Sequence, residues 1–369
     1  MEPNPRRPRT PAACRILINK TALNGLGALV KEVTVQLKRN VSGTATIVLD
    51  SFRDERGRWA VQDDDQIRPW SEVRINAVFD GRPESVLHGY IRDVKLEYPE
   101  EMSAAKVTVT VQDDLIKLDR EQHHDVLTKE GAEKPDGAIV REICDAMHLA
   151  HEAEDGMTAG ALTINATFAK FLLERAEANG YELFVRDQTL HFHPPAIDAD
   201  PQPQIRVYAG PATNCIRFSA HNDGHRPDEV RVNREPEQKG DGKGASDLER
   251  VLALLKLGPN QPALGKHPLT SQGRGLPPFV WSMDCPMGAT ESEVEIRAQA
   301  KANENQFKIT AEGVLDGSQY GHVLVPHLPV TVDGVGTTYA GRYYVDEVTH
   351  KFSKGVYEQH FKLLRNAVN

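Results

Sequence analysis

A strict alternation of apolar and polar residues runs through the first third of the chain and limits what it can fold into. Val33, Val35 and Leu37 alternate with polar residues, and the pattern returns in four later runs up to Val111. Successive side chains of a strand point to opposite faces, so each run predicts a strand with one buried and one polar face. No helical pattern lies between the runs. We therefore expect an antiparallel, tube-like β-barrel over residues 12–120.

The apolar spacing changes to that of a helix near residue 136. Asp136 is placed to cap a first helix, whose apolar face would hold Ile139, Val140, Ile143 and Met147. A second helix would begin after Asn165 or Thr167 and end at Gly180, where a left-handed residue is wanted. Residues 121–199 are therefore expected to form a small α/β domain.

Strand patterns return after residue 200. They cover residues 205–208, 216–220, 229–233, 323–325, 330–332, 343–350 and 357–364. We expect residues 200–235 and 306–369 to form a second tube-like barrel. Residues 236–305 would be an insertion, rich in Gly and Pro up to residue 289, with helices at about 246–256 and 292–305.

The predicted fold class is therefore mainly β (α+β). Two tube-like antiparallel β-barrels would carry a small α/β domain and a Gly/Pro-rich insertion. Residues 1–11 are rich in Pro and Arg and have almost nothing to bury, so they are expected to form a flexible arm.

Composition excludes several classes of protein. The 369 residues include 44 Lys and Arg against 53 Asp and Glu, a net charge of −9, which gives no global attraction to nucleic acid or anionic membranes. No apolar run approaches the roughly 20 residues that span a bilayer, and no signal-peptide pattern begins the chain. The four cysteines lack C-x-x-C spacing, which favours free thiols in a reducing compartment: Cys14, Cys144, Cys215 and Cys285.

His191 and His193 are the sharpest candidate metal ligands. They lie in the second strand of a hairpin predicted over residues 181–193, so both imidazoles would point to one face. No third ligand lies nearby at ligand spacing, and a polar sheet face is the favoured interpretation. The adjacent pair His123 and His124 is a weaker candidate, because neighbouring strand residues diverge in direction.

Paired carboxylates are the next candidates. Asp113 and Asp114 end a strand, where Asp commonly makes a turn, and the three Asp at 63–65 resemble a solvated loop tip. The chain contains no EF-hand loop and no nucleophile motif. The glycines at 240–244 are typical of a linker, and the arginines at 6–9 of a solvated arm. We therefore predict no catalytic residue, no metal, no cofactor and no enzymatic activity.

Two other functions stay open at this point. A small metal-dependent hydrolase would use His191 and His193. A carbohydrate-binding β module would present clustered aromatic side chains. With three Trp and 6% aromatic residues, the chain lacks the usual signal of the second.

Three stretches of the chain share a common resemblance. A Gly-containing strand and a strand that ends in Asp occupy residues 87–113. A helix with the pattern T-x-x-x-F-L-x-x-x-A-x-x-x-G, followed by its hairpin, occupies residues 164–192, and a closing strand pair that ends in Arg-Asn occupies residues 341–366. In this order they resemble the phage late control protein D family, the baseplate hub proteins of contractile tails, which are related to the N-terminal hub region of VgrG-type spikes. The matching positions are Gly89, Ile91, Asp113, Phe171, Leu172, Ala176, Gly180, Gly341, Tyr344, Val345, His350 and Arg365.

This resemblance implies a structural role. A homotrimer with two tube-like domains per chain would adapt a sixfold tail tube to a threefold spike and enclose a central channel. The implied partners are further copies of the chain, a tail tube protein above, a spike protein below and baseplate wedge proteins. DNA or protein cargo would pass through the channel without specific binding.

The resemblance also implies a place and a division of labour. The protein would be made and assembled in the bacterial cytoplasm and would end in the baseplate of a virion tail or an injection particle. The sequence stops at Asn369 without an OB-fold, lysozyme domain or needle. We therefore expect the spike to be a separate protein, with the insertion at 236–289 placed to hold it or the wedges.

Overall fold

The computed structural model describes most of the chain. It covers residues 12–23, 26–100, 105–129, 131, 133–158, 160, 162–233, 256–270, 276–284 and 290–369. The expected arm at 1–11 and nearly all of the helix expected at 246–256 lie outside the described residues.

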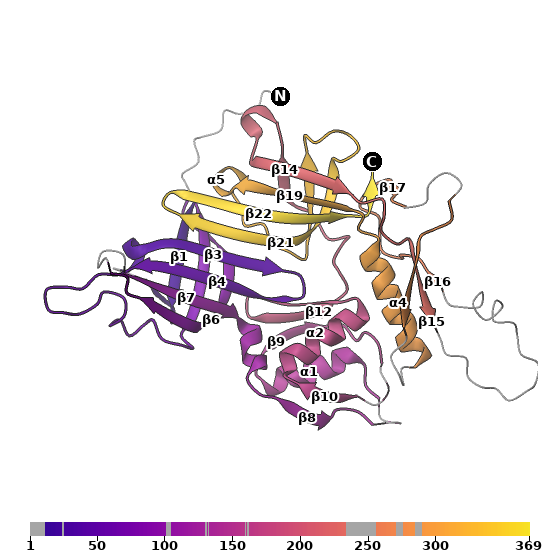
Figure 1. The fold of residues 1–369 in the computed structure, drawn as a ribbon, viewed down its shortest axis with the longest axis horizontal. Helices are drawn as coiled ribbons and strands as arrows, with labels where there is room; N and C mark the ends of the chain where they lie inside the picture. The colour runs from indigo at the N-terminus through magenta and orange to yellow at the C-terminus, as the bar shows by residue number, and fades with distance from the viewer. Residues whose placement is uncertain are drawn as a thin grey trace, which may run out of the picture.

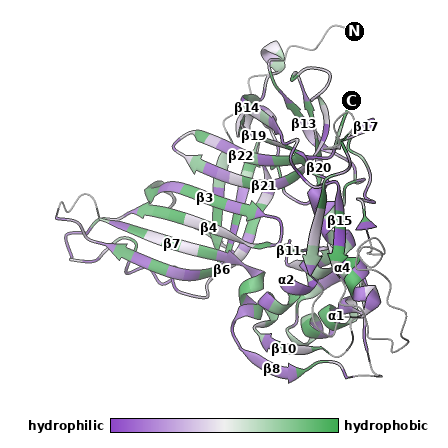
Figure 2. Cartoon of the chain, turned by 45° about the vertical axis from the view of Figure 1, so that its right-hand side comes forward, coloured by the Kyte–Doolittle hydropathy of each residue, from purple (hydrophilic) through white to green (hydrophobic). Residues whose placement is uncertain are grey.

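The first β region contains all the strands that the alternation predicted. Most apolar members of these runs, among them Val33, Val35, Ile47 and Val109, are buried in one core, whereas Leu96 and Tyr98 at the end of the fourth run are exposed. Figure 2 shows hydrophobic and hydrophilic residues alternating along these strands. The strands are β1 (Ala13–Ile18), β2 (Thr21–Ala22), β3 (Val30–Lys38), β4 (Val41–Asp50), β5 (Glu72–Phe79), β6 (Arg82–Glu97) and β7 (Lys106–Asp113).

The second β region combines residues from both sides of the insertion. Its core contains Tyr343, Val345, Val348, Phe361 and Leu363. Its strands are β13 (Gln202–Arg206), β14 (Cys215–Asn222), β19 (Ile309–Asp316), β20 (Pro329–Asp333), β21 (Gly341–Ser353), β22 (Val356–Arg365) and the short pair β17 (His267–Pro268) and β23 (Ala367–Val368), with helix α5 (Gly317–Tyr320) after β19.

Two strand assignments in this region differ from expectation. Residues 323–325 do not form a strand, because side chains take up their backbone donors: Val323 N donates to Glu84, Leu324 N to Gln359 and Val325 N to Gln202, at 2.7–2.9 Å. β19 was not predicted. Its inward positions include Ala311 and Gly313, which are too small to show an apolar alternation.

The two β regions share one continuous sheet (Figure 1). β3 pairs antiparallel with β21, so the strand order runs β14-β19-β22-β21-β3-β4-β7-β6-β5-β1-β2, with β20 and β13 attached beside β21. Phe352 and Tyr357, at the tip of the β21–β22 hairpin, pack into the first core. The expected mainly β, α+β class is confirmed, and the two halves are joined by hydrogen-bonded strands.

The α/β part lies beside the sheet (Figure 1). As expected, the Thr167 hydroxyl accepts from Lys170 N at the start of the second helix, and Gly180 ends it at φ +66°. The hairpin turns at Asp187 and Gln188, both with positive φ. Its elements are β8 (His123–Val126), α1 (Asp136–Ala146), β9 (Ala150–Ala153), β10 (Thr163–Ala166), α2 (Phe168–Asn179), β11 (Glu182–Arg186) and β12 (Thr189–His193).

The expected cap of the first helix is wrong. Pro135 occupies the cap position and Asp136 is the first helical residue. The buried Asp136 carboxylate instead accepts from Arg175 Nε and Nη2, at 2.9 and 2.8 Å, and from Asn179 at 2.6 Å. A long-range ion pair has displaced the local cap.

The insertion folds as a small sheet covered by a helix. β15 (Glu229–Asn233), which we expected in the second barrel, pairs instead with two strands of the insertion and lies between β16 (Lys256–Leu257) and β18 (Val280–Asp284). Helix α4 (Glu291–Asn305), expected at about 292–305, packs on it through Val294, Ala298 and Ala302. The helix begins with a capping box between Thr290 and Glu293. Among the described residues, no helix is long and apolar enough to cross a membrane.

Candidate functional site: a polar joint between four parts of the chain

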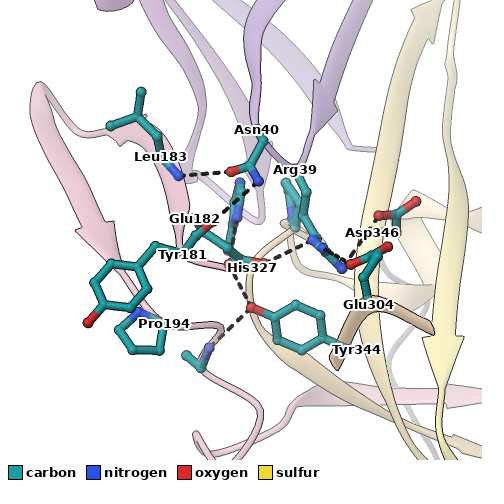
Figure 3. Close-up of polar contacts among 12 residues, drawn as sticks. Arg39, Asn40, Tyr181, Glu182, Leu183, Pro194, Glu304, His327, Tyr344 and Asp346 are labelled. Carbon is teal, nitrogen blue, oxygen red and sulfur yellow. Dashed lines mark hydrogen bonds and ion pairs between the residues drawn. The ribbon is translucent and has the colours of Figure 1, made fainter. Parts of the chain in front are cut away.

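A buried carboxylate, Glu182, lies where the α/β part meets the rest of the molecule (Figure 3). Arg39 Nε forms an ion pair with Oε1 at 2.9 Å. Tyr344 donates its hydroxyl to Oε2 at 2.7 Å, and His327 Nδ1 lies 3.0 Å from the same oxygen. Burial raises the pKa of Glu182, but His327 and Arg39 lower it by more. The pKa is therefore below its ordinary value, and the carboxylate stays charged. A buried charge persists only with such partners.

Arg39 connects three carboxylates from three elements. It lies in the turn between β3 and β4, and only 11% of its side chain is exposed. Besides Glu182 it pairs with Glu304 of α4 at 3.0 Å and with Asp346 of β21 at 3.8 Å. Burial alone would lower the pKa of Arg39, and the three carboxylates raise it overall. The guanidinium is therefore firmly charged and holds α4, β11 and β21 together.

Asn40 supplies the neutral part of the same contact. Its Oδ1 accepts from Leu183 N at 2.9 Å, and its Nδ2 donates to Tyr181 O at 3.3 Å. The amide thus satisfies two backbone groups at the start of β11. Asn40 has φ +52°, a left-handed conformation that Asn tolerates well in a hairpin turn. We call Arg39, Asn40, Glu182, His327 and Tyr344, with Glu304 and Asp346, the joint.

Four parts of the sequence meet at the joint: the first β region, the α/β part, the insertion and the second β region. The sequence did not predict this meeting, although Tyr344 was among its matched positions. Glu182 is followed by Leu183 and Phe184 in a strand, and a lone acid in such a setting was the available signal. Its partner Arg39 lies far away in sequence, so no local pattern could identify it.

The other matched positions lie at close approaches and in cores. Gly89 in β6 faces β7 so closely that a Cβ there would lie 2.0 Å from Gln112 O. Asp113 caps the 3-10 helix η3 (Asp114–Asp119) by accepting from Leu115 N, as its strand-end position predicted. Ile91 is buried in the first core. The α/β core holds Phe171, Leu172 and Ala176.

The matched positions of the closing strands are also structural. Gly341 has φ +125°, a conformation that favours glycine. Val345 exchanges backbone hydrogen bonds with His327 and Leu328. His350 Nδ1 lies 2.9 Å from the Tyr357 hydroxyl. The buried Arg365 guanidinium donates to Tyr339 O at 2.8 Å and lies 5.0 Å from the ring centre of Tyr343.

The candidate metal and acid pairs acquire other partners. His191 Nδ1 lies 3.2 Å from Glu152, and His193 Nδ1 lies 2.7 Å from Pro194 O. His123 stacks on Phe168 at 3.8 Å. Within the described ranges, no group of three or more His, Cys, Asp or Glu side chains is arranged to hold a metal ion.

Carboxylates form a second polar cluster beside the first core. Asp114 lies 2.6 Å from His88 Nδ1 and accepts from Lys117 at 2.8 Å. Burial raises the pKa of Asp113 to about 6, although hydrogen bonds from Ser42 and Gly43 oppose this rise. The three Asp at 63–65 lie in the segment between β4 and β5, where Asp63 and Asp64 accept from backbone amides and Asp65 pairs with Arg68.

Comparison with known proteins identifies the family. Residues 9–226, more than half of the chain, match the family model described as Alg8 N-terminal domain. The chain belongs to the Alg8 N-terminal domain family. No curated protein sequence matches this family member.

Solved structures show which fold this member of the Alg8 N-terminal domain family adopts. A 43 kDa tail protein of prophage MuSo2 from Shewanella oneidensis matches with a TM-score of 0.68 and 11% identity, covering 97% of this chain and 100% of that one. A tail protein from Neisseria meningitidis matches with a TM-score of 0.65 and 12% identity, covering 96% of each chain.

A third structure comes from a secretion system. It is the E. coli c3393 protein, described as a type VI secretion component similar to T4 tail proteins gp27 and gp5, with a TM-score of 0.55 and 11% identity, covering 91% of this chain and 73% of that one. The expected likeness to tail and VgrG-type proteins is confirmed at the level of the fold.

Proposed function

We propose that this chain is a structural baseplate hub of a contractile tail or a tail-derived injection system, and that it acts without catalysis. The shared fold supports this proposal, because tail proteins and a type VI secretion component have it. The charged clusters of the chain also have structural partners: they pair across elements or cap helices.

The unpaired strand edges of the large sheet support the proposal that several copies form a ring. The path from β14 to β6 contains eight strands, and every neighbouring pair is antiparallel. β14 pairs only with β19 among the described strands. β5 covers β6 no further than Tyr90, and Trp70 and Ser71 bond the backbone of Ile91, so the open edge opposite β7 runs over residues 92–97.

Strand direction makes these two edges compatible. With an even number of alternating strands, β14 and β6 run in opposite directions. The β14 edge of one copy therefore fits the open β6 edge of the next copy as an antiparallel pair. Apolar side chains accompany both edges: Ile216 is 62% exposed, and Leu96 and Tyr98 are 44% and 55% exposed. Such edges invite pairing with another chain.

Head-to-tail pairing of this kind closes into a ring when the rotation permits. We propose a homotrimer around a central channel, with a tail tube protein above, a separate spike below and wedge proteins outside. DNA or protein cargo would pass through without specific binding. The ring would act in the baseplate after assembly in the bacterial cytoplasm.

Solution mass tests the proposal directly. Three chains of 40.9 kDa would give about 123 kDa by light scattering. Ile216→Lys places a charge on the β14 edge and should leave a folded monomer, and Leu96→Lys should do the same at the other edge. The matched control is Val126→Lys, which changes a similarly exposed residue of β8 and should keep the trimer. A wild-type monomer at every concentration tested, with the spike partner present, would contradict the ring.

A further inference from the structure

Two histidines sandwich one phenyl ring beside the joint. Phe184 of β11 stacks on His327 with ring centres 3.8 Å apart and on His191 of β12 with ring centres 4.7 Å apart, both nearly parallel. His193 meets the same ring edge-on at 5.6 Å. His327 belongs to the second β region, so this stack fastens the β11–β12 hairpin to it.

His327 is held in place on every side. It is 3% exposed and has φ +69°, a left-handed conformation that is unusual for a histidine. Its amide donates to Val345 O at 3.2 Å, and its Nδ1 lies 3.0 Å from Glu182. Neighbouring Pro326 O accepts from Arg186 of β11 at 3.0 Å. The ring therefore cannot turn away without opening the joint.

Positive groups crowd this contact. Arg186 lies 5.0 Å from the Phe184 ring centre, and Arg39 already pairs with the carboxylate that faces His327. Glu182 is the buried acid at His327, while the Tyr344 hydroxyl donates to that acid. His191 faces Glu152, which is 72% exposed, together with Arg186, His193 and His327. A proton on either stacked imidazole would add a further cation to this group.

We propose that the joint is an acid-responsive fastening, in which protonation of His327 and His191 releases the β11–β12 hairpin from the second β region. The released state needs no new partner, because both imidazoles would reach water. The proposal concerns contacts within one chain and stands apart from the ring.

The shifts of both histidines agree with this direction. Burial lowers the pKa of His327, although Glu182 opposes the shift, and burial likewise lowers the pKa of His191. The closed joint therefore binds protons less readily than an open one. As the pH falls below about 6.5, each histidine should favour opening by up to about tenfold per pH unit.

Amide hydrogen exchange on the full chain can test this. The reporters are the amides of Leu183 and Ala196, whose hydrogen bonds to Asn40 Oδ1 and to the Tyr344 hydroxyl cross the joint. After correction for intrinsic rates, we expect their protection to fall between about pH 7.5 and pH 5.5, by up to about tenfold for each histidine. Amides of β7 in the first core serve as the internal reference and should keep their protection.

Matched variants identify the responsible groups. His327→Asn keeps a side chain that tolerates positive φ, and His191→Gln keeps a neutral polar group; each should reduce the loss of protection, and the double variant should abolish it. His360→Gln, at a half-buried pair with Glu358 in β22 away from the joint, should behave like the wild type. If His327→Asn does not fold, His191→Gln alone decides. The proposal is overturned by unchanged wild-type protection, by an equal loss in β7, or by a full loss in the variants.

Discussion

At the scale of single residues, His350 shows how a buried histidine makes the stability of the folded protein depend on pH. It lies in β21 with no exposed surface, and its Nδ1 lies 2.9 Å from the Tyr357 hydroxyl, its one polar side-chain contact among the described residues. Burial lowers the pKa of His350 to about 3. The unfolded chain, with a histidine pKa near 6.5, binds the proton first as the pH falls. The stability contributed by neutral His350 is therefore complete above about pH 6.5 and is lost progressively towards pH 3.

His350→Gln should remove this dependence. We expect the difference in unfolding free energy, wild type minus variant, to be constant above about pH 7 and to fall by about 1.4 kcal/mol per pH unit below about pH 6.5. Urea unfolding at a series of pH values measures it. Asp113, whose raised pKa works in the opposite direction, is common to both proteins and cancels. The exposed His124→Gln is the control, and a flat difference curve for His350→Gln would disprove the argument.

At the scale of elements, the close approach of paired strands determines which side chains fit at a given position. Gly89 gives β6 and β7 their contact, and a Cβ there would collide with the backbone of Gln112 and Asp113. Gly313 of β19 is similar, since a Cβ would lie 2.3 Å from Arg217 O of the paired strand β14. Backbone cannot move aside as a flexible side chain can, so a glycine between paired strands is a packing requirement.

Gly89→Ala should therefore destabilise the first β region by about 1–3 kcal/mol, the usual cost of overpacking. Gly27→Ala is the matched control, because Gly27 has nothing within 4 Å of its would-be Cβ and no positive φ. That variant should change stability by less than about 1 kcal/mol, in either direction. Chemical unfolding of both variants compares them, and equal effects would show that the close approach relaxes without cost.

At the scale of the whole molecule, the joint ties separate cores into one unit. The first β region, the α/β part and the second β region each have their own core. The buried ion pair between Glu182 and Arg39 links the α/β part to the first β region, and Arg39 also pairs with Asp346 of the second β region. The relative placement of the parts therefore depends on a few buried polar contacts as well as on the shared sheet.

Glu182→Gln should destabilise the protein by about 3 kcal/mol, at the lower end for a broken buried ion pair, because Arg39 keeps Glu304 and Asp346. It should also broaden the urea transition as the α/β part unfolds earlier. The control is Glu174→Gln on the exposed face of α2, expected within about 0.5 kcal/mol of the wild type. A wild-type transition in Glu182→Gln would mean that the shared sheet alone couples the cores.

The sequence by itself determined the local structure. Alternation predicted the strands of the first β region, Thr167 and Gly180 predicted the ends of α2, and residues 187–188 predicted a hairpin turn. These features depend on neighbouring residues and on which face is buried. They were enough to predict the mainly β class, whereas the likeness to tail proteins rested on the resemblance of residues 87–113, 164–192 and 341–366 to a known family.

Only the tertiary structure decided how distant side chains replace local partners. It gave the backbone donors of residues 323–325 to three side chains, took Asp136 from a cap into an ion pair, and brought Arg39 to Glu182. Each of these contacts joins residues that lie dozens to hundreds of positions apart. A buried polar group needs a hydrogen-bond partner, and tertiary packing determines which distant residue provides it. Such a contact produces no periodic pattern in the sequence.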